Sequence, residues 1–249
     1  MKLYNLLGSA ILFSCLLSGC NHKSGLPSVG KGSALSAADS MVDGEKSIFS
    51  ENGKLHYKVE YKNGKANGRV REYRSDGSLY MDAVFKDGHR DGKCTCFFKS
   101  GSVYSVINYV DGKREGIETK YYEDGKIQST NTYSKDKVLP GLKEFNRDGK
   151  EIKENVSIVI NEEDLTKSGG KFYLHVTLSD IGKNASFYAS TNPEGPREKL
   201  IMKGNTGTLE ISVSSRNFIL NKLIIEAEYI TSRRNTMRIQ RIYKMPARK

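Results

Sequence analysis

Apolar and polar residues alternate in short runs that recur every 24 residues between residues 37 and 154. One such run is Leu79, Met81, Ala83 and Phe85. A period of two is the pattern of a β-strand that buries one of its two faces. Aromatic residues mark the same step at Tyr61, Phe85, Tyr109 and Tyr133, and again at Tyr73, Phe97, Tyr121 and Phe145. Self-similarity at a fixed step indicates an array of repeats.

Turn residues separate these runs at regular places. Gly77, Gly101, Gly125 and Gly149 lie 24 residues apart, and Asp76-Gly77 is a pair that supplies the positive φ angles of a tight hairpin turn. Loops between the units, such as Asp87-Gly88, carry the same turn chemistry. We therefore expect an antiparallel meander of hairpins with one apolar face, stabilised by contacts between neighbouring units.

After residue 154 the 24-residue spacing stops and strand patterns of another kind begin. Alternating runs at residues 156–160, 172–178, 209–213 and 223–229, with shorter runs at 185–189, 198–202 and 237–243, predict about seven strands. This number and spacing favour a small β-sandwich over residues 155–249. The predicted fold class is all-β: an antiparallel meander of hairpin repeats followed by a small β-sandwich domain.

The repeats resemble a known family. The pattern G-x4-[YF]-x2-[DN]-G-x-[LVI]-x5-[YF], present in residues 44–61, 68–85 and 116–133, looks like the MORN-repeat variant of bacterial proteins known as YwqK-type antitoxins. One unit departs from it at Ser100, and the last unit departs more, with Asp136 in place of glycine and Pro140-Gly141 at its opening, which is typical of a capping unit. The resemblance implies a scaffold or binding surface, with an antitoxin as the alternative.

The N-terminus has the features of an export signal. Lys2 precedes an apolar run over residues 3–17, which is short for a transmembrane helix and leads into Leu17-Ser18-Gly19-Cys20. These four residues resemble a bacterial lipobox, which implies a signal peptide over residues 1–19 and a lipid (acyl, such as palmitate) anchor at Cys20. An ordinary secretory signal is the alternative. Asn21 after the cysteine favours the outer membrane, and residues 20–36 read as a flexible tether.

Positive charge is concentrated near the C-terminus. The chain carries a net charge of +11, yet residues 37–154 hold 22 basic and 20 acidic residues, so the repeats are nearly neutral. Beyond Ile230 the arginines Arg233, Arg234, Arg238 and Arg241 have no acid among them. Export argues against nucleic acid, so we expect an anionic lipid or glycan as the ligand of this strand, or else a solvated face without a ligand.

Residues that carry chemistry do not converge in the sequence. The chain lacks the phosphate-loop, zinc-helix and nucleophile-elbow motifs, and its four histidines lie far apart. Cys94 and Cys96 lie two residues apart on one predicted strand, a spacing that strains a disulfide between them, and we expect ordinary strand positions rather than functional thiols. We therefore predict no enzymatic activity, no cofactor and no metal.

The sequence predicts a membrane-anchored, non-enzymatic binding or scaffolding lipoprotein of the cell envelope. An envelope protein is a further possible partner. Candidate contact residues in the repeats are Tyr73, Phe97 and Tyr121, with packing into the apolar face as the other interpretation. An immunity protein that neutralises one toxin is the alternative function, and it would require a tight 1:1 complex with that toxin.

Overall fold

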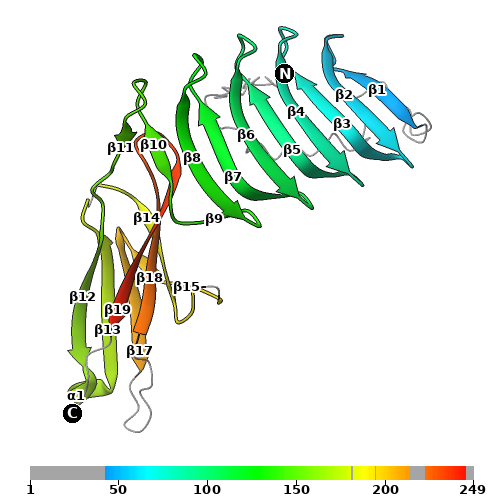
Figure 1. Ribbon diagram of the computed structural model, residues 1–249. Coiled ribbons are helices and arrows are strands. Elements are labelled where there is room, and N and C mark those ends of the chain that lie inside the picture. Colours follow the sequence, from blue (N-terminus) through cyan, green and yellow to red (C-terminus); the bar gives the residue numbers. More distant parts are fainter. Residues whose placement is uncertain (1–42, 181, 194, 213–221, 245–249) are drawn as a thin grey trace, which may run out of the picture.

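The computed structural model describes residues 43–180, 182–193, 195–212 and 222–244. Cys20, the predicted signal peptide and the predicted tether lie outside the described residues. The described part is almost entirely β-structure, as the sequence predicts, and it forms one long sheet and two smaller ones (Figure 1). Its single helix, α1 (Thr166–Gly169), is one turn long, and the described residues include no helix that is long and apolar enough to cross a membrane.

The long sheet is an antiparallel meander of eleven strands in the order β1 to β8, then β10 and β11, with β9 paired to β8. Figure 1 shows the hairpins side by side in sequence order. The strands are β1 (Gly44–Phe49), β2 (Leu55–Lys62), β3 (Lys65–Tyr73), β4 (Leu79–Lys86), β5 (His89–Phe97), β6 (Val103–Val110), β7 (Lys113–Tyr121), β8 (Ile127–Ser134), β9 (Lys137–Val138), β10 (Lys143–Phe145) and β11 (Glu151–Ile152).

Two kinds of turn connect these strands. The return turns between units have two residues with positive φ, as at Asp87 (49°) and Gly88 (88°), the geometry that suits a two-residue hairpin. The hairpin loops within units are longer. There Gly77 alone has a positive φ, of 87°, and its N–H donates to the Arg74 carbonyl at 2.9 Å. The Asp-Gly geometry that we expected at residues 76–77 therefore belongs to the return turns.

Gly101 offers a test of the hairpin loops. Its φ is +89°, and no described atom lies within 4 Å of the place that a Cβ would take, so a side chain there costs backbone strain rather than a collision. We expect Gly101→Val to destabilise the protein by about 1–2 kcal/mol, because a β-branched residue resists a left-handed backbone. Thermal denaturation measures this, with Ser102→Val as the matched control. Equal melting temperatures would contradict the turn assignment.

The last unit is a shortened one, as expected of a cap. Its strands β9, β10 and β11 have two or three residues each. Asp136 takes the positive φ of the glycine that it replaces, at 69°, and its carboxylate accepts the Arg114 N–H at 3.0 Å. An aspartate is among the few residues that tolerate this backbone conformation, so the return turn survives without glycine.

The second part of the chain is a β-sandwich. One sheet has the order β12-β13-β17-β16 and the other β15-β14-β18-β19, and side chains from both form one core. The expected run at residues 198–202 is split, because Leu200 turns into the core and the residues on its two sides pair with different sheets. The strands are β12 (Ile158–Leu165), β13 (Lys171–Leu178), β14 (Ala185–Ser190), β15 (Glu198–Lys199), β16 (Ile201–Lys203), β17 (Thr206–Ser212), β18 (Lys222–Ile230) and β19 (Thr236–Lys244).

Buried hydrogen bonds join the sandwich to the end of the repeat sheet. The Glu144 carboxylate, 2% exposed, accepts the Thr231 hydroxyl at 2.8 Å and the Asn235 amide at 2.5 Å, both from the β18–β19 turn. Lys120 on β7 donates to the Asn235 amide oxygen at 2.8 Å. Buried polar groups that lack partners are costly, so this network favours one orientation of the sandwich against the repeats.

Candidate binding surface

The two faces of the repeat sheet differ in their exposure. One face, here the buried face, carries Val59, Val70 and Ala83, which are at most 1% exposed. Successive side chains of a strand point to opposite faces. Glu72 pairs across the ladder with Tyr57 of the buried face, so the next residue, Tyr73, lies on the opposite face, here the outer face.

A β-bulge before each hairpin loop alters what the sequence pattern predicts. Glu72 pairs with Met81, but Tyr73 pairs with Leu79, which leaves Tyr80 as the extra residue. Tyr80 packs against the buried cluster, and Leu79 joins Tyr73 on the outer face. The expectation that Leu79 shares a face with Met81 is therefore wrong. The same shift occurs in the hairpins of β1–β2, β5–β6 and β7–β8.

The bulges of four hairpins, together with the pairing of β10 with β8, place one outer-face side chain from each of nine strands at about one level of the sheet. We call this row the aromatic stripe, because aromatic and aliphatic residues alternate along it. Its members, in order across the sheet, are Phe49, Leu55, Tyr73, Leu79, Phe97, Val103, Tyr121, Ile127 and Phe145. Neighbouring strands lie about 4.8 Å apart, so the stripe extends over about 38 Å, perpendicular to the strands.

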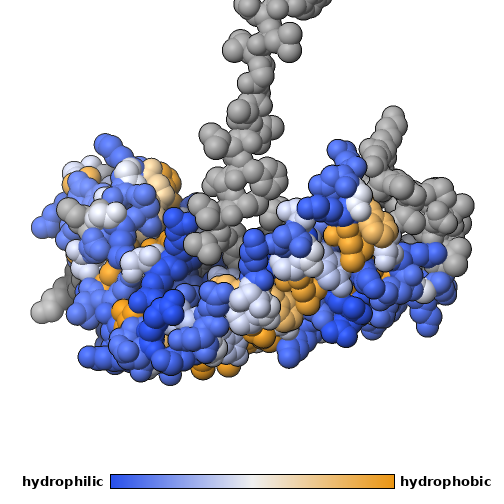
Figure 2. All heavy atoms as spheres, turned by 90° about the horizontal axis from the view of Figure 1, so that it is seen from above, coloured by the Kyte–Doolittle hydropathy of each residue, from blue (hydrophilic) through white to orange (hydrophobic). Residues whose placement is uncertain are grey.

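The stripe brings together all three aromatic residues that the sequence singled out, Tyr73, Phe97 and Tyr121. They are half-buried, while the outermost member, Phe49, is 54% exposed and Ile127 is 44% exposed. Figure 2 views the repeat sheet along its strands, from the end with the hairpin loops. It shows apolar surface in separate patches among hydrophilic residues. The aliphatic members escaped prediction because a strict period of two assigns them to the buried face.

A polar row follows the stripe, two residues away on the strands with aromatic members and three residues away, counting the bulge residue, on the others. Cross-strand pairs run through it without interruption from β1 to β10. Its members are Ser47, Lys58, Arg71, Asp82, Thr95, Val106, Thr119, Thr130 and Lys143. Three of its first four members are charged, and three of the remaining five are threonines, so the outer face offers hydrogen-bonding groups beside an apolar line.

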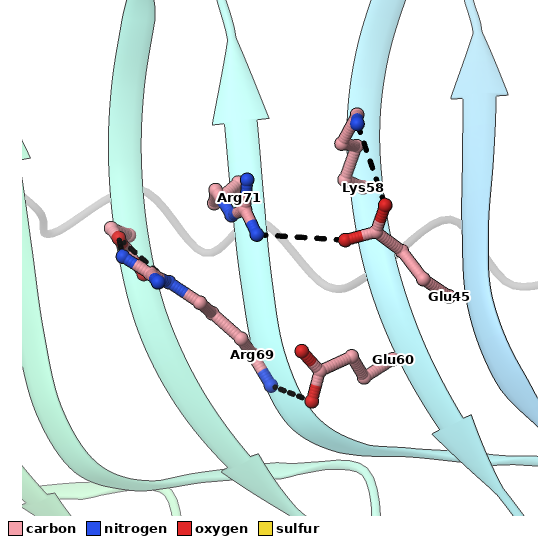
Figure 3. Close-up of polar contacts among 6 residues, drawn as sticks. Glu45, Lys58, Glu60, Arg69 and Arg71 are labelled. Atoms are coloured by element: carbon pink, nitrogen blue, oxygen red, sulfur yellow. Dashed lines mark hydrogen bonds and ion pairs between the residues drawn. The ribbon is translucent and has the colours of Figure 1, made fainter.

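Charges on the first half of the outer face pair with one another (Figure 3). Glu45 contacts Lys58 at 3.4 Å and Arg71 at 3.5 Å. Arg69 binds the Asp82 carboxylate through its side chain and the Glu60 carboxylate through its backbone N–H, at 2.9 Å. The hydrogen bond that Arg69 donates to the Asp82 carboxylate raises the pKa of Arg69. These pairs leave little net charge to attract a polyanion to this face.

Contacts between consecutive hairpin loops hold the stripe in place. Lys54 Nζ donates to the Ser75 carbonyl at 2.6 Å, and Lys99 Nζ lies 3.0 Å from the Asp76 carboxylate. At the other end Lys126 Nζ donates to the Arg147 carbonyl at 2.9 Å. Each contact is weak alone because it is exposed. Together they link neighbouring loops, and a surface that is already ordered loses less entropy on binding.

Only two of the four arginines near the C-terminus lie on the exposed surface where we expected all of them. Arg238 is buried, 7% exposed, and it pairs with Glu226 of the neighbouring strand and donates to the Val138 carbonyl at 2.9 Å. Arg233 donates to the Tyr122 hydroxyl at 2.5 Å, at the joint between sandwich and repeats. Arg234 and Arg241 are exposed, and Arg241 also donates to the Ile158 carbonyl at 2.8 Å. The sequence did not reveal the acidic partner of Arg238, because Glu226 lies on another strand.

Metal ligands and cysteine thiols are the remaining candidates for chemistry among the described residues. They contain no group of three or more His, Cys, Asp and Glu side chains that could hold a metal ion. Cys94 and Cys96 lie within the buried cluster of the repeat sheet. Burial raises the pKa of the Cys94 thiol to about 11, which disfavours the reactive thiolate. The outer face with its aromatic stripe is therefore taken as the candidate contact surface of the described residues.

Comparison with known proteins agrees with the repeat architecture. The family model for the MORN repeat variant matches residues 42–63, 90–111 and 114–135. These segments hold the β1–β2, β5–β6 and β7–β8 hairpins, and the β3–β4 hairpin between them has the same bulge and loop. No curated protein matches the chain.

Among solved structures, a DUF3823 family protein from Bacteroides ovatus matches with 14% identity over 73% of this chain and 94% of its own, at a TM-score of 0.20. A superposition this poor carries no argument about fold or function. The assignment of the repeats therefore rests on the sequence match and on the hairpin geometry. Together they identify this chain as a repeat protein with MORN repeat variants.

Proposed function

We propose that this protein is a non-enzymatic binding module of the bacterial cell envelope, anchored by lipid at Cys20, with the outer face of its repeat sheet as the contact surface. The aromatic stripe carries this proposal. It places partly exposed apolar side chains at regular intervals along one face, and repeat arrays act through extended surfaces of this kind. Tyr and Phe supply a large contact area with few rotatable bonds.

The shape of the stripe limits the kinds of ligand. It is a line along the sheet rather than a pocket, so it suits an elongated ligand that crosses the strands. The anchor and the outer membrane location are part of the proposal, because the lipobox resemblance at Leu17-Ser18-Gly19-Cys20 and the following Asn21 support them. The antitoxin alternative remains a hypothesis that requires a tight 1:1 complex with one protein.

The proposal predicts that envelope binding depends on the stripe. A triple variant with Tyr73→Ala, Phe97→Ala and Tyr121→Ala is expected to bind an immobilised detergent extract of bacterial envelopes at least about tenfold more weakly than the wild-type full chain, measured by surface plasmon resonance, because each change removes a ring from the contact line.

Val84 and Ile117 provide the matched control. Both are exposed apolar residues of the same face, 43% and 61% exposed, and both lie outside the stripe. The double variant Val84→Ala/Ile117→Ala should bind like the wild type. Equal binding by the triple variant and this control would show that the stripe has no part in the function.

A further inference from the structure

The spacing of the aromatic stripe suggests the chemical class of its ligand. Rings recur on every second strand, at Phe49, Tyr73, Phe97, Tyr121 and Phe145, with one aliphatic side chain between consecutive rings. Two strands occupy about 9.6 Å, which is close to the length of about 10 Å of one disaccharide in a β-1,4-linked sugar chain. In such a chain every second sugar presents the same face, so a ring every second strand would meet equivalent sugars.

We propose that the outer face binds a β-1,4-linked chain of N-acetylhexosamines, laid along the stripe across the strands. This inference rests on the function proposed above and names the ligand of that surface. The flat C–H face of a pyranose packs on an aromatic ring, and the alternating aliphatic residues meet the acetamido methyl groups. A sugar chain without acetamido groups has no apolar substituent for those positions.

Polar groups beside the stripe fit the remaining surface of such a chain. In the polar row, Thr95 and Thr119 lie two residues along their strands from the stripe, about 7 Å away, and Thr130 is the cross-strand partner of Thr119. Their hydroxyl groups are within reach of hydroxyl and amide groups at the edge of the sugars. Hydroxyl side chains both donate and accept hydrogen bonds, as sugar hydroxyls and acetamido groups do.

The charges of the repeats favour an uncharged ligand over a polyanion. Residues 37–154 hold 22 basic and 20 acidic residues, and the outer-face charges near the stripe pair with one another, as in Arg69 with Asp82 and Glu45 with Lys58. A polyanion would have to compete with these carboxylates. A neutral sugar chain can accept hydrogen bonds from the arginines and donate to the acids without breaking the pairs.

An added peptide strand fits this surface less well. Peptides that extend a sheet pair with the backbone at an edge strand and run along the strands. The stripe crosses the strands in the middle of the face, where the strand backbones are already paired with their neighbours from β1 to β8. Its ligand therefore contacts side chains alone, which suits a ribbon-like sugar chain.

Titration calorimetry of the purified full chain in detergent tests this inference, with chitohexaose as the probe. We expect binding that strengthens from the disaccharide to the tetrasaccharide and the hexasaccharide, because each added disaccharide reaches one more ring. Cellohexaose, which lacks the acetamido groups, and the β-1,3-linked hexasaccharide laminarihexaose are expected to bind at least about fivefold more weakly. Equal affinity for either, or no dependence on length, would overturn the inference.

Variants at Phe97 separate ring stacking from general apolar contact. Phe97→Leu keeps an apolar side chain in the half-buried position but removes the flat ring, so we expect about tenfold weaker binding of chitohexaose with an unchanged melting temperature. Ile117→Ala, outside the stripe, should leave binding unchanged, and Tyr121→Phe, which keeps the ring, should lower affinity less than Phe97→Leu. Full binding by Phe97→Leu would overturn the stacking geometry.

The outcome also separates this inference from the proposed function. If chitohexaose fails to bind while the Tyr73/Phe97/Tyr121 triple variant still loses envelope binding, the stripe is a binding surface for another ligand and the sugar assignment falls. If sedimentation shows that the wild type dimerises and Phe97→Leu does not, a second copy of the chain occupies the stripe, and the sugar assignment falls likewise. If both chitohexaose and the envelope extract fail to bind, both proposals fall.

Discussion

Replacing Arg238 with alanine is expected to lower the free energy of unfolding by about 3–5 kcal/mol, because it leaves a buried carboxylate without its closest cation. Glu226 is 1% exposed and accepts from Arg238, from Gln240 at 2.6 Å and from Arg197 at 3.1 Å. Burial alone raises the pKa of Glu226, yet the hydrogen bonds from Arg238 and Gln240 outweigh it and hold the pKa below its ordinary value. Chemical denaturation of the full chain measures the loss.

Two further variants test the cause of that loss. Arg234→Ala removes an exposed arginine four residues away and should change stability by less than about 0.5 kcal/mol. The double variant Arg238→Met/Glu226→Met should recover much of the stability lost in Arg238→Ala, because apolar residues of similar volume avoid the unpaired charge. A loss below 1 kcal/mol in Arg238→Ala would contradict the buried pair. Such a result would instead support the interpretation of this strand as a solvated face without a ligand, which the sequence left open.

Replacing Cys20 with alanine is expected to release the protein from membranes almost completely. The prediction follows from the lipobox resemblance, since the acyl chains at Cys20 would be the anchor, and two or more chains hold a protein stably where one does not. Fractionation of cells into soluble and membrane material measures the shift. Incorporation of radiolabelled palmitate measures the modification itself.

Cys15 is the matched control for the anchor. It lies in the predicted signal peptide, whose removal the lipobox resemblance implies, so Cys15→Ala should leave both palmitate incorporation and membrane association unchanged. Absence of palmitate from the wild-type protein would rule out the lipoprotein assignment. Retention of Cys20→Ala on membranes in spite of lost palmitate would instead point to a second membrane contact in the folded part.

The two faces of the repeat sheet carry different sets of aromatic residues. Tyr57, Tyr109 and Tyr133 face the buried cluster, and burial raises the pKa of Tyr57 to about 12, in line with a role in packing. Arg90 and Arg114 cover two of these rings, at 5.4 Å from Tyr109 and 4.1 Å from Tyr133. One set of aromatic residues thus packs the buried face, and the other set lies on the outer face, where we propose that the ligand binds.

Much of the architecture could be predicted from the sequence because it depends on local features. A 24-residue step, period-two runs and turn glycines such as Gly77 are set by neighbouring residues, so they indicate the meander without knowledge of distant contacts. The shortened last unit was visible in the same way, through Asp136. The strands of the sandwich could be predicted from the alternation of apolar and polar residues. The split at Leu200 could not, because only the packing of two sheets against each other divides this run between them.

Tertiary structure alone decided which residues meet. The sequence singled out Tyr73, Phe97 and Tyr121, but it assigned Leu79 to the buried face. A β-bulge reverses which residues of a strand point to each face, and it leaves only a weak signal in the local sequence. The aromatic stripe exists because the same bulge recurs in register across neighbouring hairpins. The charge of Arg238 could not be interpreted from the sequence for a similar reason. Its partner Glu226 is twelve residues away in the chain, on the adjacent strand. Whether such a pair forms and is buried depends on strand register and packing, and the distribution of charges along the chain does not show either.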